Sequence, residues 1–482
     1  MLLGAGAACL VLLSVFVADL SRPFGNSDEV IYAEYIREMH RSGDYFTLRY
    51  QGVELHQRPP TAVALYAASA YVIPGELGIR LLPALFTLLV CIGAGALVWR
   101  WSDRVEAGFA AAFFAAAVPS VFLYGRLAFS DPPFVLASIA ALAATIAAQK
   151  DSRWLPWAGG ALGAAFAIKS IAAAIPLLVL LPWLVVAVRG HREKSGTRRH
   201  SLLAAAWFAG LALPYYLYNF ATHGGEFWRE HFGRVLFDRA AGQLEDVVSI
   251  GGPSAYFKHV WQADGAIIAL AILASVVAVT AAAVKRKDRQ LGVLATYTIG
   301  TFLLLSAAGT RLPHYLLVFY PAAAICVGMA VVLAWQALPE SNRLAVVIAP
   351  VACAGLFLQT AAADPFDQIA VPAHDAQALA KIVIDHPEET DTVYSFNWYA
   401  PAFGYYAKHK WSMLTDQPRV AKTVGNTGPF RKTKSIILVP PWPTTRGFYL
   451  AGPKQLVLSL GGIHREIRGE AGNMVLIWAK PL

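Results

Sequence analysis

The stretch "GNSDEVIYAEYIREMHRSGDYF" covers residues 25–46 and follows an apolar run at 2–18. Asp28 and Glu29 stand side by side near its start, and apolar residues then recur at helical spacing. A charged, amphipathic segment after a hydrophobic one is typical of a helix in the plane of a membrane surface. Its function therefore depends on what the rest of the chain brings to the same side of the membrane.

The composition is that of a polytopic membrane protein. Of the 482 residues, 57% are hydrophobic and only 15% are charged, whereas soluble domains carry about 25% charged residues. The cysteines lie far apart in apolar stretches, which predicts buried thiols rather than a disulfide framework or a metal knuckle. They are Cys9, Cys91, Cys326 and Cys353.

Eleven segments are candidates for membrane-spanning helices, each of which needs about 20 predominantly apolar residues. They lie at 2–18, 79–99, 106–124, 132–149, 154–168, 171–188, 201–220, 265–284, 291–308, 314–336 and 343–362. The fold is predicted to be mostly α, with about 11 and up to 13 such helices. The segment 61–73 is too short to cross and is expected to lie in the interface. The first segment has no basic start and is interpreted as an uncleaved anchor.

The positive-inside rule supports this arrangement with the N-terminus in the cytoplasm. The basic runs "RGHREKSGTRRH" (189–200) and "KRKDRQ" (285–290) then both lie inside. The outer segments are 19–78, 125–131, the turn around Lys169, 221–264, 309–313 and the tail from 363.

The tail predicts a small extracytoplasmic α/β domain at 363–482, after a transmembrane domain at 1–362. The segments "TVYSFN", "SIILVPP", "QLVLSL" and "MVLIWA" are interpreted as strands, and "HDAQALAKIVIDH" as a helix. Its acidic and basic residues nearly balance, so no nucleic-acid partner is expected.

Carboxylates on the outer side admit two interpretations. Asp28 and Glu29 follow Ser27 and suit the first turn of a helix through the helix dipole. Asp131, in "YGRLAFSDPPF", precedes Pro132 and could be a helix cap in the same way. The functional alternative is that these acids bind or deprotonate an acceptor hydroxyl.

Cations gather on the same outer side, against the general trend of the positive-inside rule. Singly, each could extend along apolar surface to reach water, but together they suit a lipid phosphate or diphosphate. They are Arg58 in "ELHQRPP", Lys169 in "FAIKSIAAAIP", His231, Arg234 and Arg239 in "REHFGRVLFDRAAG", and Arg311 and His314 in "GTRLPHY". Cations and carboxylates in combination predict group transfer from a lipid phosphate.

At these residues the chain resembles the lipid-linked-sugar glycosyltransferases of the GT-C fold. The likeness is to family-39-type enzymes, which include the aminoarabinose transferase of lipid A and relatives of protein O-mannosyltransferases. It covers most of residues 20–335, and "YGRLAFSDPPF", "AFAIKS", "PYYLYNFATHGGEFWREHFGR" and "GTRLPHYLLVFYPAAA" are among its landmarks.

The resemblance implies roles for individual residues. Asp28 and Asp131 match the acids of the first two outer loops. Glu29 is a third candidate, for which support of the helix start or of the cavity rim is favoured over catalysis. Donor phosphate is expected to contact Arg58, Lys169, Arg311 and an arginine of the 231–239 stretch. The substrate cavity is expected to include Tyr32, Tyr35, His231, His314 and Tyr315.

The sequence departs from the family at Gln57, where members often carry the glutamate of a Glu-Lys-Pro-Pro motif. Arg58 keeps the cation, but Gln57 lacks the carboxylate that helps some members to bind a metal. No metal site is therefore assigned to Gln57 and His231, and a divalent cation is left open as a cofactor.

The function implied is transfer of a sugar from polyprenyl (undecaprenyl) phosphate, with inversion, on the periplasmic side of a bacterial inner membrane. The acceptor is lipid A or lipopolysaccharide, another glycan or a protein. Alternatives are a transporter or flippase for a lipid-linked or anionic solute, an inactive assembly subunit, and a ligase that uses a lipid diphosphate. The sequence leaves the sugar and the oligomeric state open.

Overall fold

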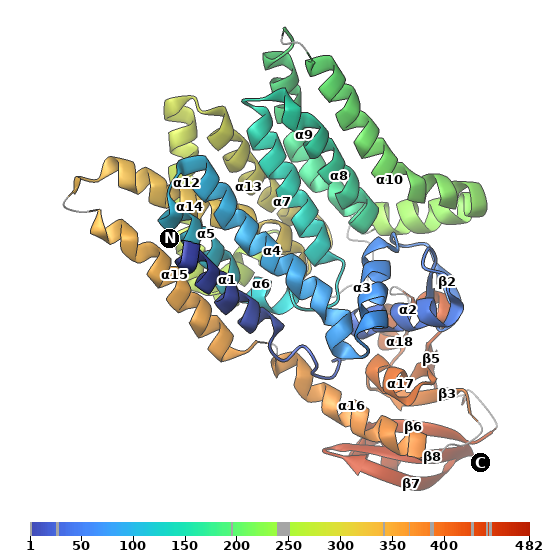
Figure 1. The fold of residues 1–482 in the computed structure, drawn as a ribbon. Coiled ribbons are helices and arrows are strands. Elements are labelled where there is room, and N and C mark those ends of the chain that lie inside the picture. Colours follow the sequence, from blue (N-terminus) through green and yellow to red (C-terminus); the bar gives the residue numbers. More distant parts are fainter. Residues whose placement is uncertain are drawn as a thin grey trace.

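A bundle of long apolar helices forms most of the molecule, and a β-sheet lies beyond one end of it (Figure 1). The computed structural model describes residues 2–25, 28–193, 196–238, 251–340, 343–365, 367–385, 390–425, 429–439, 442 and 446–482. In this part of the chain, seven segments are long and apolar enough to cross a membrane, and four further apolar helices are shorter. The protein is thus a multi-pass membrane protein.

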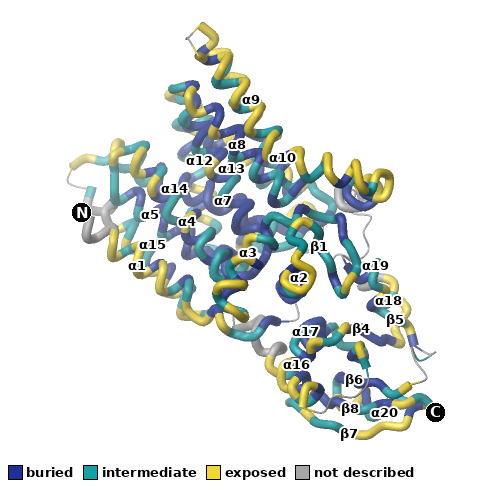
Figure 2. The backbone as a smooth tube through the Cα atoms, turned by 45° about the vertical axis from the view of Figure 1, so that its right-hand side comes forward, coloured by how far each residue is buried: buried dark blue, intermediate teal, exposed yellow. Residues whose placement is uncertain are grey.

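Each of the eleven predicted spans overlaps an α-helix, although several also include part of a second, shorter helix. These α-helices are α1 (Leu2–Val17), α4 (Glu76–Ser102), α5 (Val105–Ala117), α7 (Asp131–Ala148), α8 (Leu155–Lys169), α9 (Ala174–Gly190), α10 (Thr197–Phe227), α12 (Ala266–Arg286), α13 (Arg289–Ala307), α14 (Tyr320–Ala337) and α15 (Leu344–Ala363). The helix α7 is largely buried inside the bundle, whereas many residues of α9 and α10 are exposed (Figure 2). Many of the exposed side chains of α9 and α10 are apolar. In a membrane protein such exposed apolar faces meet lipid.

Proline changes the bounds of two predicted spans. The segment 106–124 is not one helix, because α5 ends before Pro119, and α6 (Pro119–Tyr124) starts afresh after an extended Val118. The segment 314–336 begins with a short 3-10 helix, η4 (Pro313–Val318), and α14 starts only at Tyr320. At a third site, η2 (Ser170–Ala173) joins α8 to α9 through Ser170, whose φ is 53°.

The segment between α1 and α4 packs between the bundle and the C-terminal sheet (Figures 1 and 2). It contains α2 (Asp28–Ser42), a hairpin of β1 (Leu48–Tyr50) and β2 (Val53–Leu55), and α3 (Thr61–Val72). The predicted apolar face of α2 is buried, but so are Glu34 and Glu38. The helix is therefore enclosed on most of its circumference rather than lying open on a surface, and α3 is short, as predicted.

A buried ion pair fixes the start of α2. Arg80 of α4 donates from Nε and Nη2 to the two carboxylate oxygens of Glu29, at 2.7 Å each. Both side chains are almost fully buried, at 0% exposed for Glu29 and 1% for Arg80. The amide of Ala128 also donates to Glu29 Oε1 at 3.1 Å. One carboxylate thereby joins α2, α4 and the segment that leads into α7.

The C-terminal sheet has six strands in the order β5-β4-β3-β6-β8-β7. The four strands β3, β4, β5 and β6 run parallel to one another. Strands β7 and β8 form an antiparallel hairpin, and β8 also pairs antiparallel with β6. The strands are β3 (Thr392–Phe396), β4 (Lys410–Thr415), β5 (Ile436–Leu438), β6 (Phe448–Pro453), β7 (Ile463–Ala471) and β8 (Met474–Pro481). The helices of this region are α16 (Asp367–Asp385), α17 (Pro401–Ala407), α18 (Pro418–Gly425), α19 (Phe430–Thr433) and α20 (Lys454–Ser459).

The predicted α/β character of the tail is confirmed, with one wrong element. The segment "QLVLSL" lies in the helix α20 rather than in a strand, and its Val457 is fully buried against the sheet. A short apolar run without alternation is compatible with either structure, and packing decided between them. The prediction also missed β4, β6 and β7.

Hydrogen bonds join the C-terminal region to the segment 20–55. Arg37 of α2 donates to the carbonyl of Tyr405 at 2.9 Å, and Gln51 donates to the carbonyl of Trp411 at 3.0 Å. Tyr406 donates to Glu76 at 2.9 Å at the start of α4. The tail therefore holds the segment that carries Asp28 from the side opposite the bundle.

Removal of Arg80 is expected to destabilise the whole assembly. Breaking a buried ion pair by deleting one partner costs about 3–5 kcal/mol, because the other charge is left buried without compensation. We predict that Arg80→Met lowers the free energy of unfolding by that amount, as measured by denaturant titration in mixed micelles. The control is Arg153→Met, since the Arg153–Asp151 pair is long (3.9 Å) and exposed and should contribute below about 1 kcal/mol. Equal effects of the two changes would contradict the role of the buried pair.

Candidate functional site

A cavity of about 500 Å³ lies where the bundle meets the segment 28–60. Its polar walls come from five parts of the chain that are far apart in sequence. They are Asp28, Tyr32, Gln57, Arg58, Ser130, Asp131, Lys169, Ser170, Thr310, His314 and Tyr315. The structure thus brings Asp28, Asp131, Arg58 and Lys169 into one hollow.

Asp131 and Lys169 form an ion pair in the wall of this cavity. Asp131 lies in the first turn of α7 and Lys169 in the last turn of α8, and the ammonium donates to Asp131 Oδ1. The ammonium also lies 5.1 Å from the ring centroid of Tyr315 and 5.5 Å from that of Phe134. The carboxylate of Asp131 is therefore paired with a cation, and the N-cap position of α7 belongs to Ser130, whose side chain makes no capping hydrogen bond.

Arg58 is oriented by an aromatic ring of α2. Its guanidinium lies 5.1 Å from the ring centroid of Tyr32 and donates to the hydroxyl of that residue. The same hydroxyl is 3.1 Å from Ser130 Oγ, next to Asp131. A cation–π contact and a shared hydroxyl thus hold Arg58 toward the carboxylates.

His314 is enclosed by aromatic rings and is uncharged at neutral pH. Its ring lies 5.1 Å from that of Phe129 and 4.8 Å from that of Tyr315. Burial lowers the pKa of His314 to about 4; the nearby Asp131 opposes this shift, and the cation of Lys169 adds to it. The imidazole therefore adds hydrogen-bonding capacity to the cavity without adding positive charge.

Two predicted cavity residues lie behind the wall. His231 Nε2 is 2.5 Å from Ser170 Oγ, and its Nδ1 is 2.9 Å from the carbonyl oxygen of His56. Because a carbonyl only accepts, Nδ1 carries the proton and Nε2 accepts from Ser170. Tyr35 is buried against Tyr32 and Tyr50. Both residues support the wall and do not line it.

Other predicted site residues are not brought to the cavity. Glu29 is bound by Arg80 and the amide of Ala128, so we assign it a positioning role rather than a catalytic one. Arg311 donates to the carbonyls of Ser306 at 3.0 Å and Gly251 at 2.8 Å, which directs its guanidinium toward backbone. The side chain of Arg234 and all of Arg239 lie outside the described residues.

The two serines of the wall are not among the residues predicted from the sequence. Ser130 directly precedes Asp131, and Ser170 directly follows Lys169, so position next to a charged candidate was the available signal. Their hydroxyls connect the wall to its support: Ser130 reaches Tyr32, and Ser170 reaches His231.

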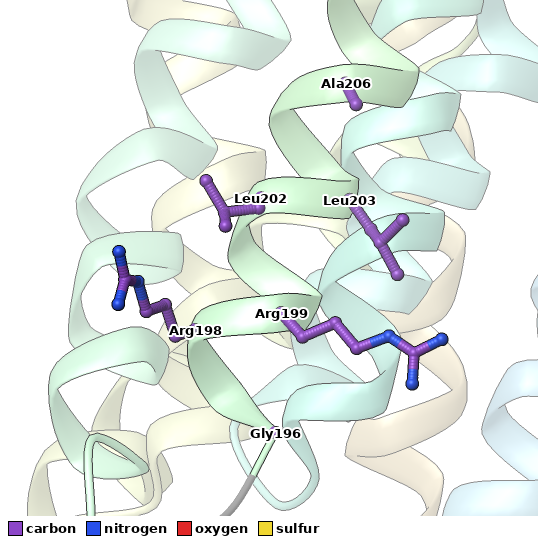
Figure 3. Close-up of a pocket in the computed structure, with 6 residues that line it drawn as sticks. All are labelled: Gly196, Arg198, Arg199, Leu202, Leu203 and Ala206. Carbon is purple, nitrogen blue, oxygen red and sulfur yellow. The ribbon is translucent and has the colours of Figure 1, made fainter.

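A second hollow, of about 540 Å³, lies at the start of α10 (Figure 3). Arg198 and Arg199 project to different sides of the helix, and Leu202, Leu203 and Ala206 complete the wall with Gly196. It has no carboxylate in its lining and belongs to the basic run predicted to face the cytoplasm. We interpret it as helix surface at the membrane boundary, and the polar cavity remains the candidate site.

The bundle, the polar cavity at its end and the C-terminal sheet define the class: a multi-pass membrane protein of the GT-C fold. A solved structure carries this assignment. The structure of ArnT from Cupriavidus metallidurans bound to undecaprenyl phosphate superposes with a TM-score of 0.75, covers 98% of this chain and 97% of its own, and is 18% identical. The predicted GT-C fold is thereby confirmed. An Archaeoglobus fulgidus oligosaccharyltransferase complex with Zn and sulfate is more distant, with a TM-score of 0.52, 14% identity, and coverage of 84% of this chain and 61% of its own.

Sequence comparisons agree with this fold. Residues 23–227 match the family model for dolichyl-phosphate-mannose-protein mannosyltransferase. The undecaprenyl phosphate-alpha-4-amino-4-deoxy-L-arabinose arabinosyl transferase 2 of Pseudomonas fluorescens is 29% identical over 228 residues, which are 44% of this chain and 38% of the relative. The corresponding transferase of Pseudomonas savastanoi pv. phaseolicola is 28% identical over 252 residues, 48% of this chain and 45% of the relative. The chain thus matches less than half the length of these relatives.

The depressed pKa of His314 predicts a pH dependence of stability. Between its ordinary value of 6.5 and about 4, the unfolded chain binds a proton at this residue and the folded chain does not. Stability therefore falls as the pH falls through this window, by up to about 2 kcal/mol between pH 6.5 and 5. We expect His314→Gln to reduce this loss in unfolding experiments at the two pH values. His374→Gln, at an exposed histidine, should leave it unchanged, and equal losses in all three proteins would contradict the prediction.

Proposed function

We propose that this protein is a glycosyltransferase that moves a sugar from polyprenyl phosphate, in the undecaprenyl form, to an envelope acceptor. The undecaprenyl form is proposed because the relatives matched by sequence are named arabinosyl transferases with this donor. Lipid A, which the family resemblance implies, is the acceptor proposed first. The observation that carries the proposal is the cavity itself, in which two carboxylates and two cations meet at the end of an apolar groove.

The cations suit the phosphate of the donor. Arg58 offers a planar fork of donors that matches phosphate oxygens, and Lys169 offers a point charge beside it. Both side chains are mostly withdrawn from solvent, so their attraction for an anion is screened less than at an open surface. Pairing of Lys169 with Asp131 limits the uncompensated positive charge before the donor arrives.

The apolar part of the cavity suits the polyprenyl chain. It is formed by Ile171, Ala172, Ala174, Ile175, Leu178, Leu304, Leu305, Ala307, Ala308, Leu312 and Val318. Leu178 of α9 is 60% exposed and Leu304 of α13 is 38% exposed, on a surface that faces lipid. The groove is therefore open sideways to the bilayer, so a lipid tail can remain in hydrocarbon while its phosphate reaches Arg58.

The reaction proposed is a single displacement at the anomeric carbon. The acceptor hydroxyl forms the new C–O bond, the bond between the anomeric carbon and the phosphate oxygen breaks, and the phosphate leaves with the electron pair. Arg58 and Lys169 stabilise the negative charge on the leaving phosphate. Asp28 is exposed in the cavity and takes the proton of the acceptor. Attack opposite the leaving group inverts the anomeric centre.

We further propose that the cavity and residues 363–482, as a domain of their own, face the periplasm from the inner membrane. The basic run at 189–200 supports this orientation, because it joins the ends of α9 and α10 that lie away from the segment 28–60 (Figure 1).

Replacement of the proposed base is expected to abolish most of the transfer. We predict that Asp28→Asn loses at least about 90% of turnover, equivalent to about 1.4 kcal/mol or more in the barrier, while folding normally. The measurement supplies purified protein with radiolabelled undecaprenyl phosphate sugars and envelope lipids and follows the label into the acceptor. Asp416→Asn, at an exposed acid next to β4, is the matched control. Unchanged turnover in Asp28→Asn would remove this residue from the site.

Narrowing the apolar groove is expected to act on the lipid tail alone. We predict that Leu178→Trp raises KM for the full-length donor about fivefold or more, a loss of about 1 kcal/mol in uniform binding. A donor with a tail of two or three isoprene units should be affected less, because it does not reach the filled part of the groove. Leu181→Trp lies on the same helix, 47% exposed and outside the lining, and serves as the control. If Leu178→Trp raised KM equally for the full-length and the short donor, the lipid tail would not lie in this groove.

A further inference from the structure

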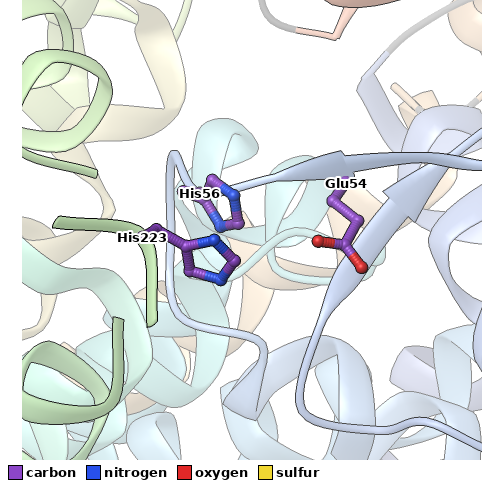
Figure 4. Close-up of side chains that lie close together, drawn as sticks. All are labelled: Glu54, His56 and His223. Atoms are coloured by element: carbon purple, nitrogen blue, oxygen red, sulfur yellow. The ribbon is translucent and has the colours of Figure 1, made fainter. Parts of the chain in front are cut away.

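Three side chains with metal-ligand chemistry converge outside the cavity. Glu54 is the middle residue of β2, His56 directly follows β2, and His223 lies near the end of α10. One ligand atom from each lies within 4.8 Å of the others. Figure 4 shows the two imidazoles facing each other with the carboxylate beside them, and the ring centroids are 4.0 Å apart. We propose that these residues form a binding site for a divalent cation, with Zn²⁺ as the ion that the donor set fits.

The donor set is the basis for this choice. Two imidazole nitrogens and one carboxylate oxygen are a common set of three protein ligands for Zn²⁺, which takes tetrahedral geometry and leaves a fourth position for water. With metal–ligand bonds of about 2.0–2.1 Å, the ligand atoms of such a site lie about 3.3 Å apart. The ligand atoms lie within 4.8 Å of one another, which is wider than this value, so binding would draw them together. Hard cations such as Mg²⁺ prefer oxygen ligands and fit the pair of histidines poorly.

Neighbouring groups orient the ligands and balance their charge. Arg49 Nη2 donates to Glu54 Oε1 at 2.7 Å, which holds the carboxylate in place, as is usual for metal-binding acids. His56 is buried, at 4% exposed. Lys432 also approaches the site, since it donates to the carbonyl of Glu54 at 3.2 Å. Its charge is offset by Glu226 at 3.0 Å and Glu230 at 3.1 Å, so it does not oppose a bound cation.

A bound ion would connect the segment that carries Arg58 to α10. His56 is two residues before Arg58, and its carbonyl accepts from His231 at 2.9 Å and from Tyr215 at 3.2 Å. Gly224, directly after His223, has φ 48° and ψ −119° and interrupts the helix at the ligand. The ion would thus fix Arg58 from outside the cavity, and the role of the three ligands is positioning rather than catalysis.

Zinc binding to the full-length protein tests the site without any substrate. Purified protein in detergent is treated with a chelator, dialysed, and titrated with Zn²⁺ by calorimetry, while metal content and thermal unfolding are followed. The expected result is one tightly bound Zn²⁺ per chain and a higher unfolding temperature with zinc than with chelator. His223→Ala should weaken binding tenfold or more and remove the thermal shift.

Matched variants distinguish the site from other histidines. Glu54→Gln keeps an oxygen that can accept from Arg49 but loses the negative charge. Because the side chain of Glu54 is 44% exposed, this variant should fold, and it replaces His223→Ala as the test if that variant does not fold. His464→Ala, on the exposed edge strand β7, should bind Zn²⁺ as the unaltered protein does. Absence of stoichiometric zinc in the unaltered protein, or zinc binding that neither His223→Ala nor Glu54→Gln weakens, would overturn the proposal. Because no sugar donor is used, neither result bears on the proposed sugar transfer, which is tested separately.

Discussion

The bidentate pair between Glu29 and Arg80 is the interaction on which the arrangement of the cavity depends. A carboxylate without access to water must have its oxygens satisfied within the protein, and here α4 and the amide of Ala128 do so. The first turn of α2 is therefore fixed relative to α4 and to the start of α7. Adjacent residues on a helix point about 100° apart, so anchoring Glu29 in the interior directs Asp28 into the cavity.

The charged groups of the cavity are compensated by neighbouring side chains even when no phosphate is bound. Asp131 compensates Lys169, the ring of Tyr32 stabilises Arg58, and burial keeps His314 neutral. A phosphate can then bind to two cations that are already oriented, so no free energy is needed to bring these cations together. This arrangement favours chemistry at the membrane surface over transport, because the charged groups are at one end of the bundle and the apolar groove leads sideways into lipid.

The hairpin of β1 and β2 connects the cavity to the rest of the molecule. It contacts the C-terminal region through Gln51 and Lys432. The carbonyl of His56, directly after the hairpin, accepts from Tyr215 of α10 and from His231 beyond the end of α10. Arg58 follows directly from it, so any group that stiffens the hairpin also stiffens the proposed phosphate site. The cluster of Glu54, His56 and His223 is placed to do this without entering the cavity.

Hydropathy alone indicated the long apolar helices, seven of which are long enough to cross a membrane in the described part of the chain, and the motifs indicated the GT-C fold. The four predicted site residues Asp28, Arg58, Asp131 and Lys169 line one hollow. The local hydropathy pattern does not decide between a helix and a strand for a short apolar run such as "QLVLSL". This segment forms α20, in which Val457 packs on the sheet. The sequence pattern assigned Asp28 to the substrate and Glu29 to the helix start or the cavity rim, but it did not find Arg80 as the partner of Glu29, or Ser170 and His223. Those assignments depend on which distant segment lies opposite each side chain, and only the packing of helices far apart in the chain decides that.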